Sequence, residues 1–236
     1  MNSIIENCHI WHDTSPRGGA MNMAIDQLLM EDLSDVPILR FYSWNEPSIT
    51  FGYFGSLSKA QAHFPEDDLT YIRRWTGGGI VDHRADLTYT LILPQSHPWS
   101  SLRGPESYRL IHQAAANSLN IIGINCQLTG NNKLKCVPHR GPCFTNPVEY
   151  DIVDSNGQKL AGAGQKRSRR KLLHQGSIIG IQDTKAWKEE FTKQLTDSPI
   201  PWIPEVSFSS EVRFYELATE LAEQRYASPE WNAKRP

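Results

Sequence analysis

The sequence predicts an α+β fold, with a largely antiparallel sheet flanked by helices. The strand-like segments gather in the middle of the chain between helical segments, without the regular alternation of strand and helix that a parallel sheet requires. The chain of 236 residues also lacks internal repeats, low-complexity tracts and Gly/Ser-rich linkers. A single domain over residues 1–236, with a substantial buried core, is therefore expected.

The first half of the chain is predicted to form one helix and several short strands. Apolar residues recur at helical spacing from 20 to 33, with polar residues opposite them. Pro37 precedes a β-rich run, and a turn at Asn45-Glu46-Pro47 separates that run from the next. The strands expected here are 38–42, 48–51, 71–74 and 87–93.

The second half begins with a helix from Pro105, which suits a first helical position, to Ile122, with Gly123 as its cap. Apolar and acidic residues alternate from 148 to 152, which predicts a half-buried strand. The remaining expected elements are strands at 159–166 and 175–181, joined by a basic turn, and helices at 183–195 and 210–226.

Composition and charge exclude several classes of protein. Hydrophobic residues make up 39% of the chain, and 24 Lys and Arg face 26 Asp and Glu, for a net charge of −2. This balance argues against a disordered chain and against nucleic-acid binding through bulk charge. No apolar run approaches the ~18 residues of a membrane span, and the first residues lack the layout of a secretory signal. We expect a soluble, cytoplasmic protein with no membrane or nucleic-acid partner.

An unusual segment runs from Arg73 to His83 and reads Arg-Arg-Trp-Thr-Gly-Gly-Gly-Ile-Val-Asp-His. Its consecutive glycines expose backbone N–H groups to a ligand, and its two arginines can pair with a carboxylate or phosphate. A tight hairpin that uses glycine for positive φ is the purely structural interpretation. The segment is neither a Walker phosphate loop nor a dinucleotide-binding fingerprint.

A second segment, Gly157 to Gln165, places Lys159 at the start of a strand whose following residues are nearly all small. Small residues make room for a ligand against the strand. A lysine at the open edge of such a pocket can hold a positive charge beside an acyl oxygen or a phosphate. The alternative is an ordinary surface lysine.

The cysteines are Cys8, Cys126, Cys136 and Cys143, too few for a disulfide scaffold, so reduced thiols are expected. Cys143 stands in a Gly-Pro-Cys-Phe loop, where a thiol is either exposed and reactive or buried and inert. A zinc site of Cys126, Cys136, His139 and Cys143 is a third interpretation, but the spacing lacks the Cys-x2-Cys pair of common zinc modules.

The sharpest run of charge is Lys166–Lys171, which contains five Lys and Arg around Ser168. Such a run is usually a solvated turn. In a chain with a negative net charge it suits an acidic protein partner at least as well as a nucleic acid.

Taken together, these motifs resemble the signature of the lipoate–protein ligase and octanoyltransferase family, relatives of the biotin–protein ligases. The resemblance covers roughly residues 10–230. It rests on segments that occur in the family's order: Met21–Asp26, Pro37–Arg40, Pro47–Tyr53, Arg73–His83, Gly157–Gln165 and Leu173–Ile178.

The resemblance implies a catalytic domain of mixed, largely antiparallel β-sheets flanked by helices, with an acyl pocket at its centre and no metal ligands. Lys159 would be the active-site lysine. The chain ends about where the family's C-terminal accessory domain would begin, so that domain is expected to be absent. The residues that would bind substrate are Arg74, Thr76, Gly77, Gly78, Gly79, His83 and Gly162.

Cys143 distinguishes two branches of the family, because ligase-like octanoyltransferases use a cysteine in the loop before the lysine motif as their nucleophile. Cys143 resembles that cysteine. The resemblance therefore implies transfer of an octanoyl group from acyl carrier protein to a lysine of a lipoyl domain, such as glycine cleavage H protein or a 2-oxoacid dehydrogenase E2, without a cofactor.

Two alternatives stay open. An ATP-dependent lipoate–protein ligase would need ATP and magnesium, and Cys143 would be incidental to it. A non-catalytic binder of lipoyl domains or of the carrier is the other. Two departures from the family pattern bear on this choice: Arg84 stands where the family has Asp, and Ala163 stands where it has Ser or Thr.

Overall fold

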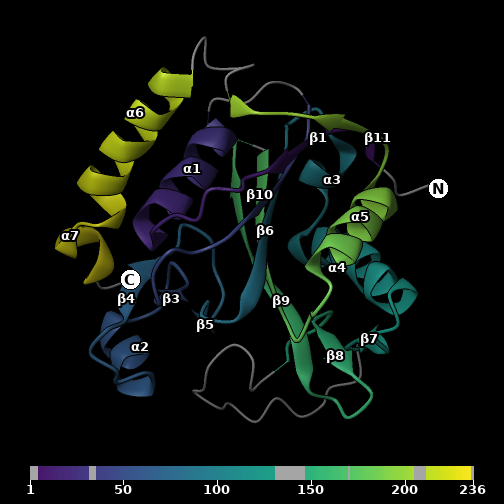
Figure 1. The fold of residues 1–236 in the computed structure, drawn as a ribbon, viewed down its shortest axis with the longest axis horizontal. Coiled ribbons are helices and arrows are strands. Elements are labelled where there is room, and N and C mark those ends of the chain that lie inside the picture. Colours follow the sequence, from purple (N-terminus) through teal and green to yellow (C-terminus); the bar gives the residue numbers. More distant parts are fainter. Residues whose placement is uncertain (1–4, 32–35, 131–146, 170, 205–210, 235–236) are drawn as a thin grey trace.

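The computed structural model describes residues 5–31, 36–130, 147–169, 171–204 and 211–234. Within them, a large eight-stranded sheet crosses the molecule and a three-stranded sheet lies beside it (Figure 1). The strands of the large sheet are β1 (Ile5–His12), β2 (Ile38–Tyr42), β6 (Asp86–Leu93), β7 (Cys126–Leu128), β8 (Ile152–Asp154), β9 (Lys159–Ser168), β10 (Lys171–Ile179) and β11 (Thr196–Pro201), and those of the small sheet are β3 (Ser48–Phe51), β4 (Thr70–Arg73) and β5 (Ile80–Asp82).

The large sheet has the strand order β11-β1-β2-β6-β10-β9-β8-β7, and the small sheet has the order β4-β3-β5. β1 is parallel to both β2 and β11, whereas the other neighbours in the large sheet pair in antiparallel fashion. In the small sheet, β3 is parallel to β4 and antiparallel to β5. The predicted α+β class, with mixed and largely antiparallel sheets, is confirmed.

Helices cover both faces of the large sheet. They are α1 (Gly19–Glu31), α2 (Leu57–His63), α3 (Pro98–Ser101), α4 (Gly104–Ile121), α5 (Thr184–Leu195), α6 (Glu211–Leu221), the π-helical turn η2 (Ala222–Tyr226) and α7 (Pro229–Asn232). Figure 1 shows α1 and α6 on one face and α3, α4 and α5 on the other, while α2 lies beside the small sheet. Across the described residues, no helix combines the length and the apolar character needed to cross a lipid bilayer.

Side-chain alternation along the central strands supplies a core on each face of the sheet. Ile38 of β2 and Ile92 of β6 belong to the core beneath α1 and α6. The adjacent residues Leu39 and Leu91 belong to the core beneath α4 and α5. The central strands are therefore buried on both faces.

Most predicted helices and strands are confirmed, but the strand predicted at 148–152 is wrong. Residues 149–150 form a turn, and only Ile152 belongs to a strand. The Asp151 carboxylate accepts a hydrogen bond from the Val148 N–H (2.7 Å), and Tyr150 has a φ of 67°. A local side-chain acceptor thus replaces the ladder partner that the alternating pattern suggested.

Candidate active site

A pocket lies where β9 and β10 of the large sheet meet the small sheet. Arg74, His83, Lys159 and Gly162, which the sequence singles out, all line it. The other lining residues are Met23, Tyr42, Trp44, Thr50, Val81, Thr88, Ala163, Gly164, Gln175, Gly176 and Ser177.

The signature loop, which we define as residues 75–79, packs directly on β9. The Gly77 N–H donates to the Gln165 carbonyl (3.3 Å). A Cβ atom built on Gly164 would lie 2.4 Å from the Gly77 carbonyl oxygen and 2.8 Å from Thr76 Oγ1. Gly164 is therefore required for this close approach. Because Gly164 itself lines the pocket, it lies between the signature loop and the pocket.

Arg74 holds the signature loop from inside. Its guanidinium donates to Thr50 Oγ1 (2.6 Å) and to the carbonyls of Gly77 (3.1 Å) and Gly79 (3.0 Å). The sequence suggested that this arginine and its neighbour pair with an anion. In the structure, Arg74 instead lines the pocket and holds the signature loop together. Thr76, Gly77, Gly78 and Gly79 are not among the residues that line this pocket, and Gly78 and Gly79 line a separate hollow beside α2.

Arg73 points away from the pocket and fastens the C-terminal segment. Its side chain is fully buried and donates to the carbonyls of Trp231 (2.9 Å) and Asn232 (3.1 Å). The expectation that Arg73 pairs with a carboxylate or phosphate is wrong for this structure, because backbone carbonyls occupy its donors. Its role is structural.

His83 lies in a chain of polar contacts at the pocket wall. Its Nδ1 is 2.7 Å from Asp86 Oδ2, its Nε2 is 2.7 Å from Thr50 Oγ1, and its ring stacks on Trp44 with centroids 4.0 Å apart. Because the Asp86 carboxylate can only accept, Nδ1 carries a proton. Sequence reasoning missed Asp86, although a carboxylate three residues after a candidate histidine was the available signal.

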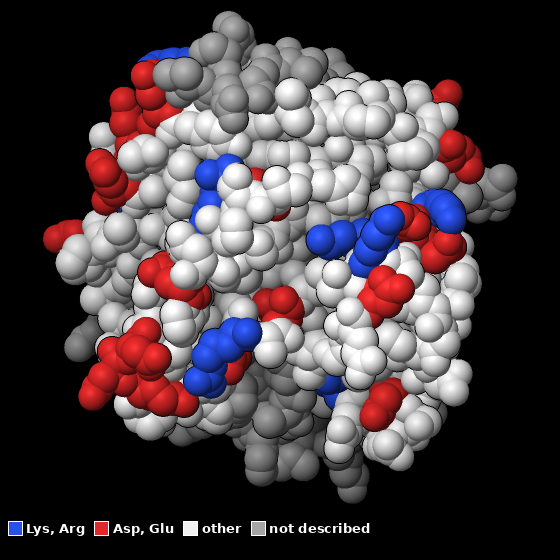
Figure 2. All heavy atoms as spheres, viewed as in Figure 1, with Lys and Arg blue, Asp and Glu red and all other residues white. Residues whose placement is uncertain are grey.

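Arg84, which departs from the family pattern, lies on the surface outside the pocket. It pairs with Asp82 (2.7 Å) and with Glu66 (3.3 Å). Figure 2 shows carboxylates gathered at the lower left, over the region of α2 and β4. Arg84 therefore lies on an acidic surface. It does not line the pocket, so its departure from the family pattern does not change the side chains there.

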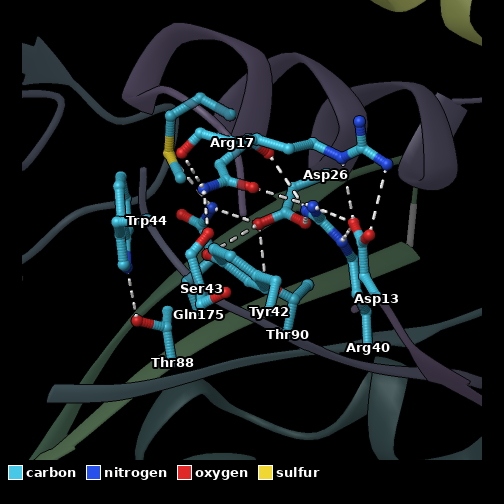
Figure 3. Close-up of polar contacts among 12 residues, drawn as sticks. Asp13, Arg17, Asp26, Arg40, Tyr42, Ser43, Trp44, Thr88, Thr90 and Gln175 are labelled. Carbon is cyan, nitrogen blue, oxygen red and sulfur yellow. Dashed lines mark hydrogen bonds and ion pairs between the residues drawn. The ribbon is translucent and has the colours of Figure 1, made fainter. Parts of the chain in front are cut away.

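A buried hydrogen-bond network connects the signature loop to α1 and β2. Figure 3 shows the part of it around Asp26, Arg40 and Gln175. Thr76 Oγ1 donates to Gln175 Oε1 (2.7 Å), and Gln175 Nε2 donates to Asp26 Oδ2 (2.7 Å). Asp26 also pairs with Arg40 (2.8 Å), which is fully buried and pairs with Asp13 (2.8 Å). Thr76 is thus held in place by a satisfied network, which fixes geometry because each buried charge keeps its partners.

Lys159 begins β9 and is buried, with 4% of its surface exposed. Its ammonium lies 2.7 Å from Asp151 Oδ2. The Tyr108 hydroxyl donates to Asp151 Oδ1 (2.6 Å) and accepts the Ala163 N–H (2.9 Å). The predicted place at an open pocket edge is wrong, because the lysine is a buried charge held by a carboxylate at the pocket wall.

Gly162 makes room for this lysine. A Cβ atom at Gly162 would lie 2.5 Å from Lys159 Nζ. Ala163 has no side-chain hydroxyl, but its backbone N–H donates a hydrogen bond to the Tyr108 hydroxyl. Tyr108 and Asp151 are site residues that the sequence did not reveal, since they lie on a helix and a turn far from the lysine motif.

The candidate nucleophile Cys143 lies outside the described residues, as do Cys136 and His139 of the alternative zinc site. Burial raises the pKa of the Cys8 thiol to about 12 and that of the Cys126 thiol to about 11. These two thiols are therefore poor nucleophiles near neutral pH. Within the described part of the chain, no group of three or more His, Cys, Asp or Glu could hold a metal ion.

The basic run Lys166–Lys171 is less solvated than the sequence suggested. β9 continues to Ser168 and β10 begins at Lys171, which pairs with Ser168. Arg167 is half-buried and donates to the Ser100 carbonyl (2.8 Å) and to Ser107 Oγ (2.6 Å). Arg167 therefore secures the strand against α3 and α4 and is unavailable to a partner.

Solved structures with a similar fold come from lipoate ligases. A crystal structure of lipoate-protein ligase A bound with ATP superposes with a TM-score of 0.72 at 20% identity, covering 99% of this chain and 100% of that one. A bi-partite lipoate protein ligase from Thermoplasma acidophilum gives a TM-score of 0.63 at 20% identity, covering 99% of this chain and 98% of that one. These similarities establish the fold.

Curated relatives are more similar in sequence. The octanoyltransferase LipM of Halalkalibacterium halodurans is 33% identical, over 71% of this chain and 64% of that protein. The match thus spans less than two thirds of that relative's length. The octanoyltransferase LipM of Bacillus anthracis is 30% identical, over 92% of this chain and 94% of that protein.

The family model described as the lipoyl protein ligase A/B catalytic domain matches residues 19–198. This range contains the signature loop, Lys159 and the strands that line the pocket. The chain belongs to the lipoyl protein ligase A/B catalytic-domain family.

Proposed function

We propose that the protein is a cysteine-dependent octanoyltransferase, which moves an octanoyl group from acyl carrier protein to a lysine of a lipoyl domain. Relatives named octanoyltransferase LipM support this activity at 33% and 30% identity. The observation that carries the proposal is the buried Lys159 ammonium at the wall of a pocket that the family motifs enclose. A fixed positive charge in a site shielded from water stabilises a developing oxyanion strongly.

The proposed reaction has two transfers. In the first, the Cys143 thiol gives up its proton, its thiolate attacks the carbonyl carbon of the octanoyl thioester, and the bond to the carrier sulfur breaks. The carrier sulfur leaves as a thiolate and takes up the proton that Cys143 released. In the second, a neutral lysine amine attacks the acyl-enzyme, an amide forms, and the Cys143 thiolate is released as the amine loses its proton. No ATP is required, because both the donor and the acyl-enzyme are thioesters and remain activated.

In this scheme Lys159 stabilises the carbonyl oxygen as it gains negative charge, and favours the thiolate of Cys143. The signature loop, with Thr76, Gly77, Gly78 and Gly79, supports the acyl pocket from outside by packing on Gly164, which lines it. Met23, Tyr42, Trp44 and Val81 give the pocket apolar surface that suits an alkyl chain.

The polar contacts at the pocket favour an enzyme over a non-catalytic binder. His83 keeps a carboxylate partner in Asp86 although Arg84 replaces the usual aspartate. Lys159 likewise keeps its carboxylate in Asp151 although Ala163 replaces a hydroxyl-bearing residue. Neither departure leaves a pocket residue without its contacts.

One comparison of donors separates the transferase from an ATP-dependent lipoate ligase, whose fold this chain shares. Purified protein and apo lipoyl domain are mixed with octanoyl acyl carrier protein, and in parallel with octanoate, ATP and magnesium. Octanoylation only with the carrier supports the proposal. Octanoylation only with ATP would replace it with the ligase, and octanoylation in neither mixture would leave a binder.

A further inference from the structure

A surface beside the signature loop combines aromatic rings, one of them exposed, with cations that form no ion pair with any carboxylate among the described residues. Phe54 is 76% exposed and packs edge-on against Tyr53, with ring centroids 5.0 Å apart. Cations from two distant parts of the sequence lie over this aromatic group. We call it the cation–aromatic surface and define it as Tyr53, Phe54, Trp75, Lys166, Arg225 and Lys234.

Each cation of this surface contacts aromatic rings. Lys166 Nζ lies 5.2 Å from the Trp75 ring centroid and 5.6 Å from that of Tyr53. The Arg225 guanidinium lies 5.5 Å from the Trp75 centroid. Lys234 Nζ lies 5.3 Å from the Tyr53 centroid and donates to the Tyr53 hydroxyl (3.3 Å). The rings thus hold the three cations in a defined arrangement.

The charge of this surface is unbalanced. Among the ion pairs in the described part of the chain, none includes Lys166, Arg225 or Lys234. The Lys234 hydrogen bond also lowers the pKa of Tyr53. A surface of this kind attracts an anionic partner and steers its approach.

The surface is connected to the pocket along one face of β9. Side chains of residues two apart in a strand point to the same face, so Gly162, Gly164 and Lys166 share a face. Gly162 lies against Lys159, Gly164 lies against the signature loop, and Lys166 lies over Trp75 and Tyr53. The four residue-to-residue steps from Gly162 to Lys166 span about 13 Å.

The charge decides which of the two macromolecular substrates this surface fits. The acceptor brings a lysine, and its ammonium would approach three unneutralised cations, which is unfavourable. The donor brings an acyl thioester at the end of an extended arm that is linked to the carrier through a phosphodiester. With the acyl group in the pocket, the arm can lie along the β9 face and place its phosphodiester near Lys166.

We infer that the cation–aromatic surface is the docking site for the acyl donor, an acidic carrier protein whose arm carries a phosphodiester. This inference rests on the proposed function, because it takes the donor to be a carrier thioester. It also narrows the interpretation that the run Lys166–Lys171 suits an acidic protein partner. Of that run it assigns Lys166, and it adds Arg225 and Lys234 from the C-terminal part of the chain.

The test is a binding measurement that does not depend on turnover. The ligand is acyl carrier protein with an octanoyl amide on its arm, which cannot be transferred, titrated at low and at high salt. The Lys166→Gln/Lys234→Gln double variant should bind it about tenfold more weakly than the wild type at low salt, with a smaller dependence on salt. Phe54→Ser should weaken binding by a similar factor at both salt concentrations, because its contact is apolar.

The matched control is Lys185→Gln/Lys193→Gln, which removes the same charge from α5, on the other side of the sheet from α7 (Figure 1). It should bind like the wild type. Wild-type affinity in the Lys166→Gln/Lys234→Gln variant would overturn the inference. The inference would also be overturned if the Lys166→Gln/Lys234→Gln variant bound apo lipoyl domain more weakly than the wild type but bound the carrier equally well. The surface would then serve the acceptor.

A competition experiment checks the phosphodiester. Octanoyl-pantetheine with a terminal phosphate should displace the carrier from the wild type better than octanoyl-pantetheine without it, and the double variant should not distinguish them. Equal competition on the wild type would contradict the assigned role of Lys166. If instead the wild type binds the carrier as expected but transfers no octanoyl group from it, the proposed function fails while the docking site stands.

Discussion

Lys159 has a structural role beside the catalytic one that we propose, because its ammonium is the partner of the buried Asp151 carboxylate. Lys159→Met keeps most of the side-chain volume and removes the charge. We expect acyl transfer to fall by about 10² or more. We also expect the free energy of unfolding to fall by about 2–4 kcal/mol, since a buried carboxylate loses its cation. Single-turnover transfer and urea unfolding measure the two effects.

A double variant separates the two roles of Lys159. Lys159→Met/Asp151→Asn removes both charges, so it should recover part of the lost stability and none of the lost activity. Near-normal transfer by Lys159→Met would show that this lysine takes no part in the reaction.

Gly164 and Gly77 belong to the same contact but tolerate a side chain differently. A Cβ at Gly164 would collide with the Gly77 carbonyl at 2.4 Å, whereas a Cβ at Gly77 meets nothing within 4 Å. Gly164→Ala should lower the free energy of unfolding by about 2 kcal/mol or more, because backbone must move. Gly77→Ala, the matched control, should change it by less than about 1 kcal/mol. Equal stability of the two variants in urea would show that the signature loop does not pack on β9 as described.

At the scale of residues, the sequence singled out residues that line the pocket better than the residues that hold them in place. Lys159 and His83 stand in motifs with unusual composition, and both line the pocket. Their carboxylate partners Asp151 and Asp86 are single acidic residues in ordinary surroundings. Tyr108 lies on α4 and reaches Ala163 only through the packing of that helix on the sheet, which no local pattern reveals.

At the scale of elements, Arg73 at the end of β4 holds α7 and the residues after it against the small sheet. The Arg73 guanidinium donates to backbone carbonyls of Tyr53 (2.6 Å), Gly55 (2.7 Å) and Trp231 (2.9 Å). A lysine cannot satisfy this planar set of acceptors. We expect Arg73→Lys to lower the free energy of unfolding by about 2–4 kcal/mol in urea titrations.

The control for Arg73→Lys is Arg109→Lys on the exposed side of α4, where the same change should stay within about 0.5 kcal/mol. Comparable losses in both variants would mean that the contacts of Arg73 do not hold the C-terminal segment in place.

Elements with a clear hydrophobic period were predicted well, and elements shaped by local hydrogen bonds were not. α1 and α5 follow from helical spacing, and the N-cap of α5, Asp183, accepts the Ala186 N–H (2.9 Å). β11 contains Pro199 and Pro201 and was not predicted, because proline is compatible with a strand only at an edge. An edge position is a property of the whole sheet, so the sequence of β11 does not show it.

At the scale of the whole molecule, buried histidines make stability depend on pH. Burial lowers the pKa of His112 to about 4 and lowers the pKa of His174 well below its usual value. Between about pH 6.5 and pH 4 the unfolded chain therefore binds more protons than the folded chain. The free energy of unfolding should fall as pH falls through this range, by about 3 kcal/mol from His112 alone.

His112→Gln tests this source of pH dependence. His112 Nδ1 donates to the Tyr150 carbonyl (2.7 Å), and glutamine keeps a donor for it. Urea unfolding at several pH values between 4 and 7 should show a shallower slope for the variant than for the wild type. An unchanged slope would mean that the pKa of His112 is the same in the folded and unfolded states.

The central claim is that acyl transfer passes through a thioester on Cys143, and intact-protein mass spectrometry tests it directly. Wild-type protein incubated with octanoyl acyl carrier protein, without acceptor or ATP, should gain one octanoyl group that hydroxylamine removes. Cys143→Ala should abolish this adduct, whereas Cys8→Ala and Cys126→Ala should keep it, because burial raises the pKa of both thiols. An adduct and full transfer in Cys143→Ala would contradict the account.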